Sequence, residues 1–291
     1  MLGQWSFDPP VVLGIGLTLL LYARGQARLS RPQTALRRWQ IAAFILGLLA
    51  VLAALESPVD AFSATLFWMH MVQHLLLIMV AAPLLVAGDG AAPILRGLPL
   101  RWRRPPLRYV ARQPAVRRSG HMLAWLLSPR SVLIIFLVDL YVWHWPPLFD
   151  LTLRNDAVHL VEHLCFLTTA LLFWSRVIDQ RGVRTTLGYA HRVVYVLVAA
   201  FSSNVLAMYL VFAPRPIYAP YADLGSRLYG ISALADQQLA GAIMWVPSLF
   251  VFGGIAAVLF FKLLGQEDWA QPQGTYRVIS DQQDTEPSAV S

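Results

Sequence analysis

Histidine offers the most chemistry in this sequence of 291 residues. The chain has seven histidines, and four of them form two pairs with partners four residues apart, His70 with His74 and His159 with His163. Residues at i and i+4 share one face of an α-helix, so each pair presents two imidazoles side by side. Imidazole nitrogens bind copper, zinc, iron and haem. The spacing therefore predicts a metal or haem site built from two helices.

Further residues can complete such a site. A fifth histidine, His144, lies in a Trp-His-Trp segment at residues 143–145. Methionine sulfur is a soft ligand that favours Cu(I), and Met71 and Met208 are the candidate thioether ligands. Three polar residues are expected to hydrogen-bond and orient the imidazole rings: Glu162, Asp236 and Gln237. The loop 213–235 is rich in proline and tyrosine, and it can cover the site or receive a partner.

The composition indicates which elements must position these residues. The chain is 57% hydrophobic and only 13% charged, with a mean hydropathy of +0.55, whereas soluble domains carry about 25% charged residues. We therefore predict an all-α polytopic membrane protein, a seven-transmembrane-helix bundle. A window of about 19 residues finds seven apolar segments of the required length, at residues 8–23, 39–55, 66–87, 131–149, 157–178, 190–212 and 236–264.

The same pattern predicts a simple domain organisation. Residues 1–265 are expected to form one seven-helix membrane domain. Its Arg-rich loop 88–130 is expected to lie on the cytoplasmic membrane surface. Residues 266–291 are polar and are expected to form a disordered cytoplasmic tail.

The basic residues orient the bundle. Of the 23 Lys and Arg residues, 20 fall in the loops of one side and three in those of the other. Cytoplasmic loops carry the excess of Lys and Arg, so we predict the N-terminus outside and the C-terminus in the cytoplasm. Loops that face anionic lipid explain the net charge of +7, and no nucleic-acid partner is expected. In this orientation the five candidate histidines lie roughly 3–14 Å below the outer surface, whereas His121 and His191 belong to the cytoplasmic side.

The residues leave several chemistries open. An outward-facing His and Met site can hold Cu(I) and pass it to a partner, while paired histidines on two helices can also ligate a haem. His159-Leu-Val-Glu-His163 matches the inverted zinc-protease pattern H-x-x-E-H, but this pattern is short, and we predict no enzymatic turnover. A membrane scaffold without metal is the further alternative. Cys165 is the only cysteine, which excludes internal disulfides, and no role is assigned to it or to Asp139.

Four motifs carry a resemblance to a known family. They are His70-Met-Val-Gln-His74-Leu-Leu-Leu with the following Ala82-Pro83-Leu-Leu, Trp143-His-Trp-Pro-Pro-Leu-Phe149, His159-x-x-x-His163 and Asp236-Gln-Gln-Leu-Ala-Gly-x-x-Met-Trp245. Their order and their placement on the predicted spans resemble the multi-pass CtaG-type cytochrome c oxidase assembly factors of bacteria. The resemblance covers approximately residues 40–265.

The resemblance implies a role in producing active haem-copper oxidase, at the copper-insertion step. It implies that the histidines of the family correspond to the five candidate histidines. It also implies that the acidic-amide motif of the family corresponds to Asp236 and Gln237. It also implies a multi-pass protein of the bacterial inner membrane. The expected partners are an oxidase subunit, a periplasmic copper donor and membrane lipid.

Overall fold

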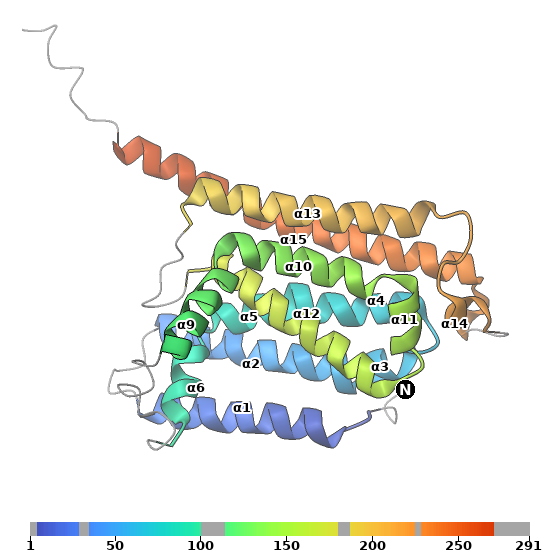
Figure 1. The fold of residues 1–291 in the computed structure, drawn as a ribbon, viewed down its shortest axis with the longest axis horizontal. Helices are drawn as coiled ribbons and strands as arrows, with labels where there is room; N and C mark the ends of the chain where they lie inside the picture. The colour runs from blue at the N-terminus through green and yellow to red at the C-terminus, as the bar shows by residue number, and fades with distance from the viewer. Residues whose placement is uncertain (1–4, 29–34, 100–113, 180–186, 225–227, 271–291) are drawn as a thin grey trace, which may run out of the picture.

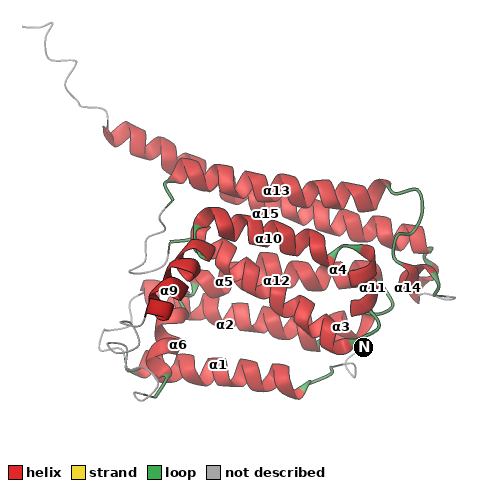
Figure 2. Cartoon of the chain, viewed as in Figure 1, coloured by secondary structure: helices red, strands yellow, loops and turns green. Residues whose placement is uncertain are grey.

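The structure is a bundle of long helices lying side by side (Figures 1 and 2). It is a computed structural model that describes residues 5–28, 35–99, 114–179, 187–224 and 228–270, and no strand occurs among these residues. The long helices are α1 (Pro9–Ala27), α2 (Ala35–Glu56), the run α4 (Phe67–Leu75), η1 (Leu76–Ala81) and α5 (Ala82–Ala87), α10 (Pro129–Trp143), α12 (Asp156–Val177), α13 (Tyr189–Phe212) and α15 (Ala233–Ala270). The all-α fold predicted from the sequence is confirmed.

Short helices close the two ends of the bundle (Figure 1). At the end predicted to face outward lie α3, α11, α14 and a 3-10 turn, with bounds Pro58–Ser63, Pro146–Thr152, Ala219–Ala222 and Leu228–Gly230. At the opposite end lie α6 and α9, with bounds Ala91–Gly97 and Pro114–Leu126.

The described residues hold six helices long and apolar enough to cross a membrane. A seventh span results if Gly120–Leu126 and Pro129–Trp143 are counted together, although they meet at an angle of 65°. The predicted span 131–149 is broken, because α10 ends at Trp143 and α11 begins at Pro146. Proline has no backbone N–H to continue a helix, which explains the break.

The predicted surface loop and tail are partly helical. Within 88–130 the structure contains α6 and α9, while residues 100–113 lie outside the described residues. Helix α6 packs tightly on α1, since a Cβ added at Gly25 would lie only 1.8 Å from the carbonyl oxygen of Pro93. Helix α15 continues to Ala270, and the remaining part of the predicted tail, 271–291, lies outside the described residues.

A turn of π-helix interrupts the third span two residues after His74. In η1 the hydrogen bonds skip one residue more than in an α-helix. Pro83 lacks the N–H that would bond the carbonyl of Met79, which favours an irregular turn here. The carbonyl of Ile78 instead accepts a 2.7 Å hydrogen bond from the indole nitrogen of Trp174. The irregular turn is therefore anchored to α12.

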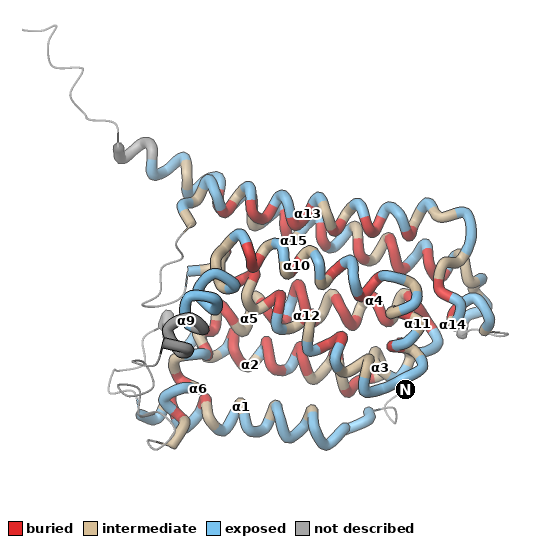
Figure 3. The backbone as a smooth tube through the Cα atoms, in the orientation of Figure 1, coloured by how far each residue is buried: buried red, intermediate tan, exposed pale blue. Residues whose placement is uncertain are grey.

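Buried residues gather on the faces that the central helices turn toward one another (Figure 3). The large fully buried side chains include Phe67, Phe166, Phe173, Trp174 and Phe252. Helix α1 is different, because only 11% of its apolar window is buried. The protein core thus lies between α4, α10, α12, α13 and α15, where the candidate histidines are found.

Candidate metal centre

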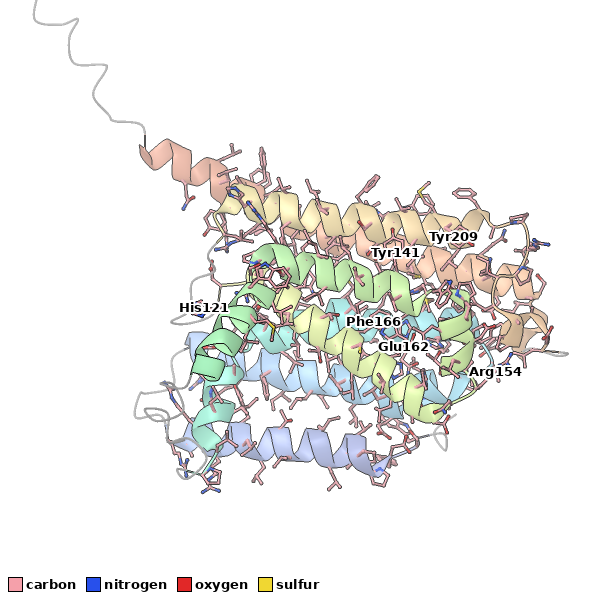
Figure 4. All side chains as sticks on the ribbon, in the orientation of Figure 1. His121, Tyr141, Arg154, Glu162, Phe166 and Tyr209 are labelled. Atoms are coloured by element: carbon pink, nitrogen blue, oxygen red, sulfur yellow. The ribbon has the colours of Figure 1, made fainter. Side chains whose placement is uncertain are left out.

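The structure brings all five candidate histidines together. His70 and His74 come from α4, His159 and His163 come from α12, and His144 caps the end of α10. Four of them are at most 5% exposed, and His159 is partly buried. Glu162 lies between the two histidines of α12 and is fully buried. Figure 4 shows its side chain, with that of Phe166, in the part of α12 near α4.

Four of these residues form a tight group of ligand atoms. One ligand atom from each of His70, His159, Glu162 and His163 lies within 4.8 Å of every other. The group contains three imidazole nitrogens and one carboxylate oxygen. This donor set suits copper, zinc or iron.

His74 borders this group closely. Its Nε2 atom lies 2.9 Å from the Nε2 atom of His70. The Glu162 carboxylate lies 3.5 Å from His70 Nε2 and 3.6 Å from His74 Nε2. The ring of His74 is 6.1 Å from that of His144, measured between centroids. All five imidazoles thus belong to one continuous cluster around Glu162.

Hydrogen bonds set the tautomers of two rings. The Tyr221 hydroxyl donates its proton to the carbonyl of Ser63, so its oxygen can only accept at the 3.1 Å contact with His70 Nδ1. Burial raises the pKa of Tyr221 well above its ordinary value, which keeps this proton in place. His144 Nδ1 donates to the carbonyl of Leu140 at 2.8 Å. Both rings therefore carry the proton on Nδ1 and have the lone pair on Nε2. Nε2 of His144 has no hydrogen-bond partner among the described residues, whereas Nε2 of His70 contacts Nε2 of His74.

Several buried polar atoms of the cluster have no hydrogen-bond partner within the described part of the chain. They are His74 Nδ1, His144 Nε2, His159 Nε2, His163 Nε2 and both carboxylate oxygens of Glu162. Buried polar atoms are normally paired, because leaving one unpaired costs about 1–3 kcal/mol. Such a concentration of unpaired nitrogen and oxygen atoms fits a bound metal ion.

Aromatic side chains enclose the cluster. The Phe166 ring lies 4.6 Å from His74 and the Phe149 ring 5.0 Å from His70, between centroids. Tyr218 packs on Phe149 and donates a 2.9 Å hydrogen bond to the carbonyl of His144. Of the two roles that the sequence left open for the loop 213–235, Tyr218 and Tyr221 fit that of a cover over the site. The sequence indicated the loop but not which tyrosines would contact the site.

Asp236 acts on the backbone of α4. Its two carboxylate oxygens each accept a 3.0 Å hydrogen bond, one from the N–H of Phe67 and one from the N–H of Trp68. The expected contact with an imidazole N–H is replaced by a cap on the helix that carries His70. A carboxylate at this position satisfies free N–H groups and complements the helix dipole.

Gln237 also acts indirectly. Its side-chain oxygen accepts a 2.7 Å hydrogen bond from the N–H of Ile217, and its nitrogen donates to the carbonyl of Leu210. These bonds hold the chain beside Tyr218, which covers the cluster. We expected Gln237 to orient an imidazole ring, but its side chain binds the backbone of Leu210 and of the covering loop.

The two candidate methionine ligands lie in different environments. Met71 is fully buried beside the histidines, whereas Met208 is 41% exposed on the outer face of α13. The prediction of Met208 as a ligand is therefore corrected. Its position along the chain gives a suitable depth, but the rotation of α13 turns its side chain away from the cluster.

Asp139 and Cys165 lie away from the histidines. Asp139 accepts a 2.7 Å hydrogen bond from Thr169, and both line a groove of about 550 Å³ between α10 and α12. Cys165 is partly buried in the same groove. The groove does not include any histidine.

Comparisons with known proteins give relatives in mycobacteria. The chain is similar to uncharacterized proteins of Mycobacterium bovis and Mycobacterium tuberculosis, each 27% identical over 260 residues, and of Mycobacterium leprae, 25% identical over 252 residues. These matches cover 83–84% of this chain but only 36–37% of each relative, so the chain spans little more than a third of their length. No solved structure matches the chain.

A match to a family model shows the family of the chain. Residues 20–266 match the model of the cytochrome c oxidase caa3 assembly factor family. This range includes the five histidines, Glu162 and the capping residue Asp236. Together with the apolar helices, the match fits a multi-pass protein of the bacterial inner membrane. The chain belongs to the cytochrome c oxidase caa3 assembly factor family.

Proposed function

We propose that the protein takes part in the assembly of cytochrome c oxidase by holding copper at the histidine cluster and delivering it to an oxidase subunit. The family match supports the assembly role. One observation supports the metal role, namely that ligand atoms of His70, His159, Glu162 and His163 lie within 4.8 Å of one another. The protein is a carrier in this proposal and turns over no substrate.

Charge balance favours Cu(I) as the cargo. Glu162 is the only carboxylate in the ligand group, and the histidines bind metal in their neutral form. One carboxylate and one Cu(I) ion sum to zero charge, whereas a divalent ion leaves a net positive charge in a buried site. Uncompensated charge is costly in such an apolar enclosure.

The geometry disfavours the haem alternative. Bis-histidine haem ligation requires a porphyrin ring to pass between two imidazoles. Here the ring centroids of His70 and His159 are 5.0 Å apart, those of His159 and His163 are 4.2 Å apart, and Nε2 of His70 faces Nε2 of His74 at 2.9 Å. A macrocycle does not fit between rings that contact one another at these distances.

Copper analysis of histidine variants tests the metal role. We expect the double variant His70→Ala/His163→Ala, purified in detergent, to lose at least one copper equivalent per chain while it keeps its helical content. The matched control is His121→Ala/His191→Ala, which removes two exposed histidines outside the cluster. His121 lies on α9 at the opposite end of the bundle (Figure 4). Unchanged copper content in the cluster variant would falsify the assignment of copper to the cluster, and a wild-type protein without copper would favour a scaffold.

The same variants test delivery in cells. A strain that lacks the gene is expected to make oxidase protein without its full copper content. The wild-type gene and the control variant should restore the copper, and the cluster variant should not. Fully metallated, active oxidase in the deletion strain would contradict a role in copper delivery.

A further inference from the structure

A small cavity adjoins the histidine cluster in the bundle interior. Its volume is about 30 Å³. The side chains around it include three methionines and two members of the cluster: Met71, Met79, Met244, His74 and His144. They come from α4, η1, α15 and the end of α10. Leu75, Ile78, Phe136, Leu140, Ser203 and Ser248 complete the lining, so three thioether and two imidazole side chains border one small space.

The cavity reaches deeper into the membrane than the histidine pairs. Asp236 of α15 meets Phe67 of α4, which places these two residues at one level. From there, Met244 is eight residues and Met79 twelve residues further along their helices. At 1.5 Å per residue these positions are about 12 and 18 Å deeper, near the middle of a hydrocarbon core about 30 Å thick.

The arrangement differs from ordinary packing by methionine. Methionine commonly fills irregular gaps in a core, yet here a gap lined in part by three methionines stays open. A single water needs only about 10–15 Å³, so the space of about 30 Å³ is large enough for one ion. The lining is almost entirely apolar, but His144 Nε2 is buried there without a hydrogen-bond partner. An unpaired nitrogen beside three thioethers is a donor set for a soft cation.

We propose that this cavity is a second copper site, selective for Cu(I), with Met71, Met79 and Met244 as thioether ligands and His144 as the nitrogen ligand. This inference rests on the proposed copper function and adds to it. Neutral thioethers are soft ligands that favour Cu(I) over the harder Cu²⁺. A soft, neutral site is therefore suited to holding the reduced ion away from water.

His74 connects the two sites. Its ring lines the cavity, while its Nε2 atom lies 2.9 Å from His70 Nε2 in the histidine group. An ion can thus move from the histidine group to the cavity by ligand exchange at His74, without crossing a region that lacks donors. Copper keeps its oxidation state throughout this transfer.

X-ray absorption at the copper edge tests the site. The probe is Cu(I), loaded anaerobically onto the full chain in detergent. We expect both sulfur and nitrogen neighbours in the wild type. The variant Met71→Leu/Met79→Leu/Met244→Leu should lose the sulfur neighbours and about one copper equivalent. Exchange of Met for Leu nearly conserves volume, so the core tolerates it.

The chain offers a matched control. The variant Met69→Leu/Met122→Leu/Met208→Leu also removes three methionines, none of which lines the cavity, and it should keep the sulfur neighbours. His70→Ala/His163→Ala should keep sulfur-bound copper, because the cavity retains its own ligands.

The outcomes separate this inference from the proposed function. Wild-type protein with copper bound by nitrogen and oxygen alone overturns the cavity site and leaves copper binding by the histidine cluster standing. If copper keeps its sulfur neighbours in the variant Met71→Leu/Met79→Leu/Met244→Leu, the sulfur comes from other residues, and this result also overturns the cavity site. Wild-type protein that binds no copper overturns both proposals.

Discussion

The proton on the His70 ring is controlled from outside the cluster. The hydroxyl of Tyr221 gives its proton to a carbonyl and accepts the Nδ1 proton of His70, so the Nε2 lone pair faces the other ligands. Such partners of a metal-binding histidine raise ligand basicity and fix the ring, and their loss typically weakens metal affinity 10–100-fold. Tyr221 is thus a positioning residue for the proposed site.

We expect Tyr221→Phe to weaken copper binding about tenfold or more, because the His70 ring loses its acceptor and can adopt either tautomer. A competition titration with a copper chelator measures the affinity. Tyr209→Phe is the matched control, since Tyr209 is 58% exposed on α13. Equal affinities of Tyr221→Phe and the wild type would show that the hydroxyl does not orient His70.

At the scale of elements, α15 fixes the start of α4. Asp236 is fully buried and satisfies the N–H groups of both Phe67 and Trp68. His70 follows one turn later, so the position of its ring depends on this cap. The motif around Asp236 therefore contributes to the cluster through a helix terminus, without supplying a metal ligand in this proposal.

We expect Asp236→Ala to lower the free energy of unfolding by about 2 kcal/mol, because two buried N–H groups lose their acceptor. Thermal unfolding in detergent measures the change, and copper affinity should fall with it. Asp156→Ala is the control, since Asp156 is exposed in the first turn of α12 and should change stability by no more than about 0.5 kcal/mol. Equal effects of the two substitutions would argue against the cap.

The spacing of residues predicted some of these elements and not others. The i, i+4 spacing places His70 with His74, and His159 with His163, on one helix face whatever the tertiary packing. It does not give the rotation of a helix within the bundle, and for this reason the prediction failed for Met208. Tyr221 is 151 residues from His70, and no local pattern links the two.

At the scale of the whole molecule, the orientation in the membrane stays a prediction from the Lys and Arg distribution. Labelling of single cysteines in intact cells can test it in a Cys165→Ala background. We expect Arg154→Cys, at the end bearing the histidines (Figure 4), to react with a membrane-impermeant maleimide. Gly188→Cys, exposed at the other end, should react only after permeabilisation. The reverse pattern would place the cluster on the cytoplasmic side.

Composition predicted the class of the whole molecule well because hydropathy is summed over many residues. The breaks in the spans were harder to predict, since each depends on a few local bonds. The end of α10 follows from Pro146 and Pro147, whereas the π-helical turn needs the indole of Trp174, supplied by another helix. The features that could not be predicted from the sequence therefore depend mostly on interactions between segments that are distant in the chain.

The cap on α4 also orders events during biosynthesis. Asp236 follows Phe67 by 169 residues, and ribosomes add about 5–20 residues per second. About ten seconds therefore pass between the synthesis of Phe67 and the synthesis of the Asp236 carboxylate that caps α4. All five histidines are synthesised before α15. Until α15 is made, the chain lacks the Asp236 cap that fixes the start of α4 and with it the position of His70. In the proposed copper function, newly made chains therefore acquire a fully supported site only when the last span has been inserted.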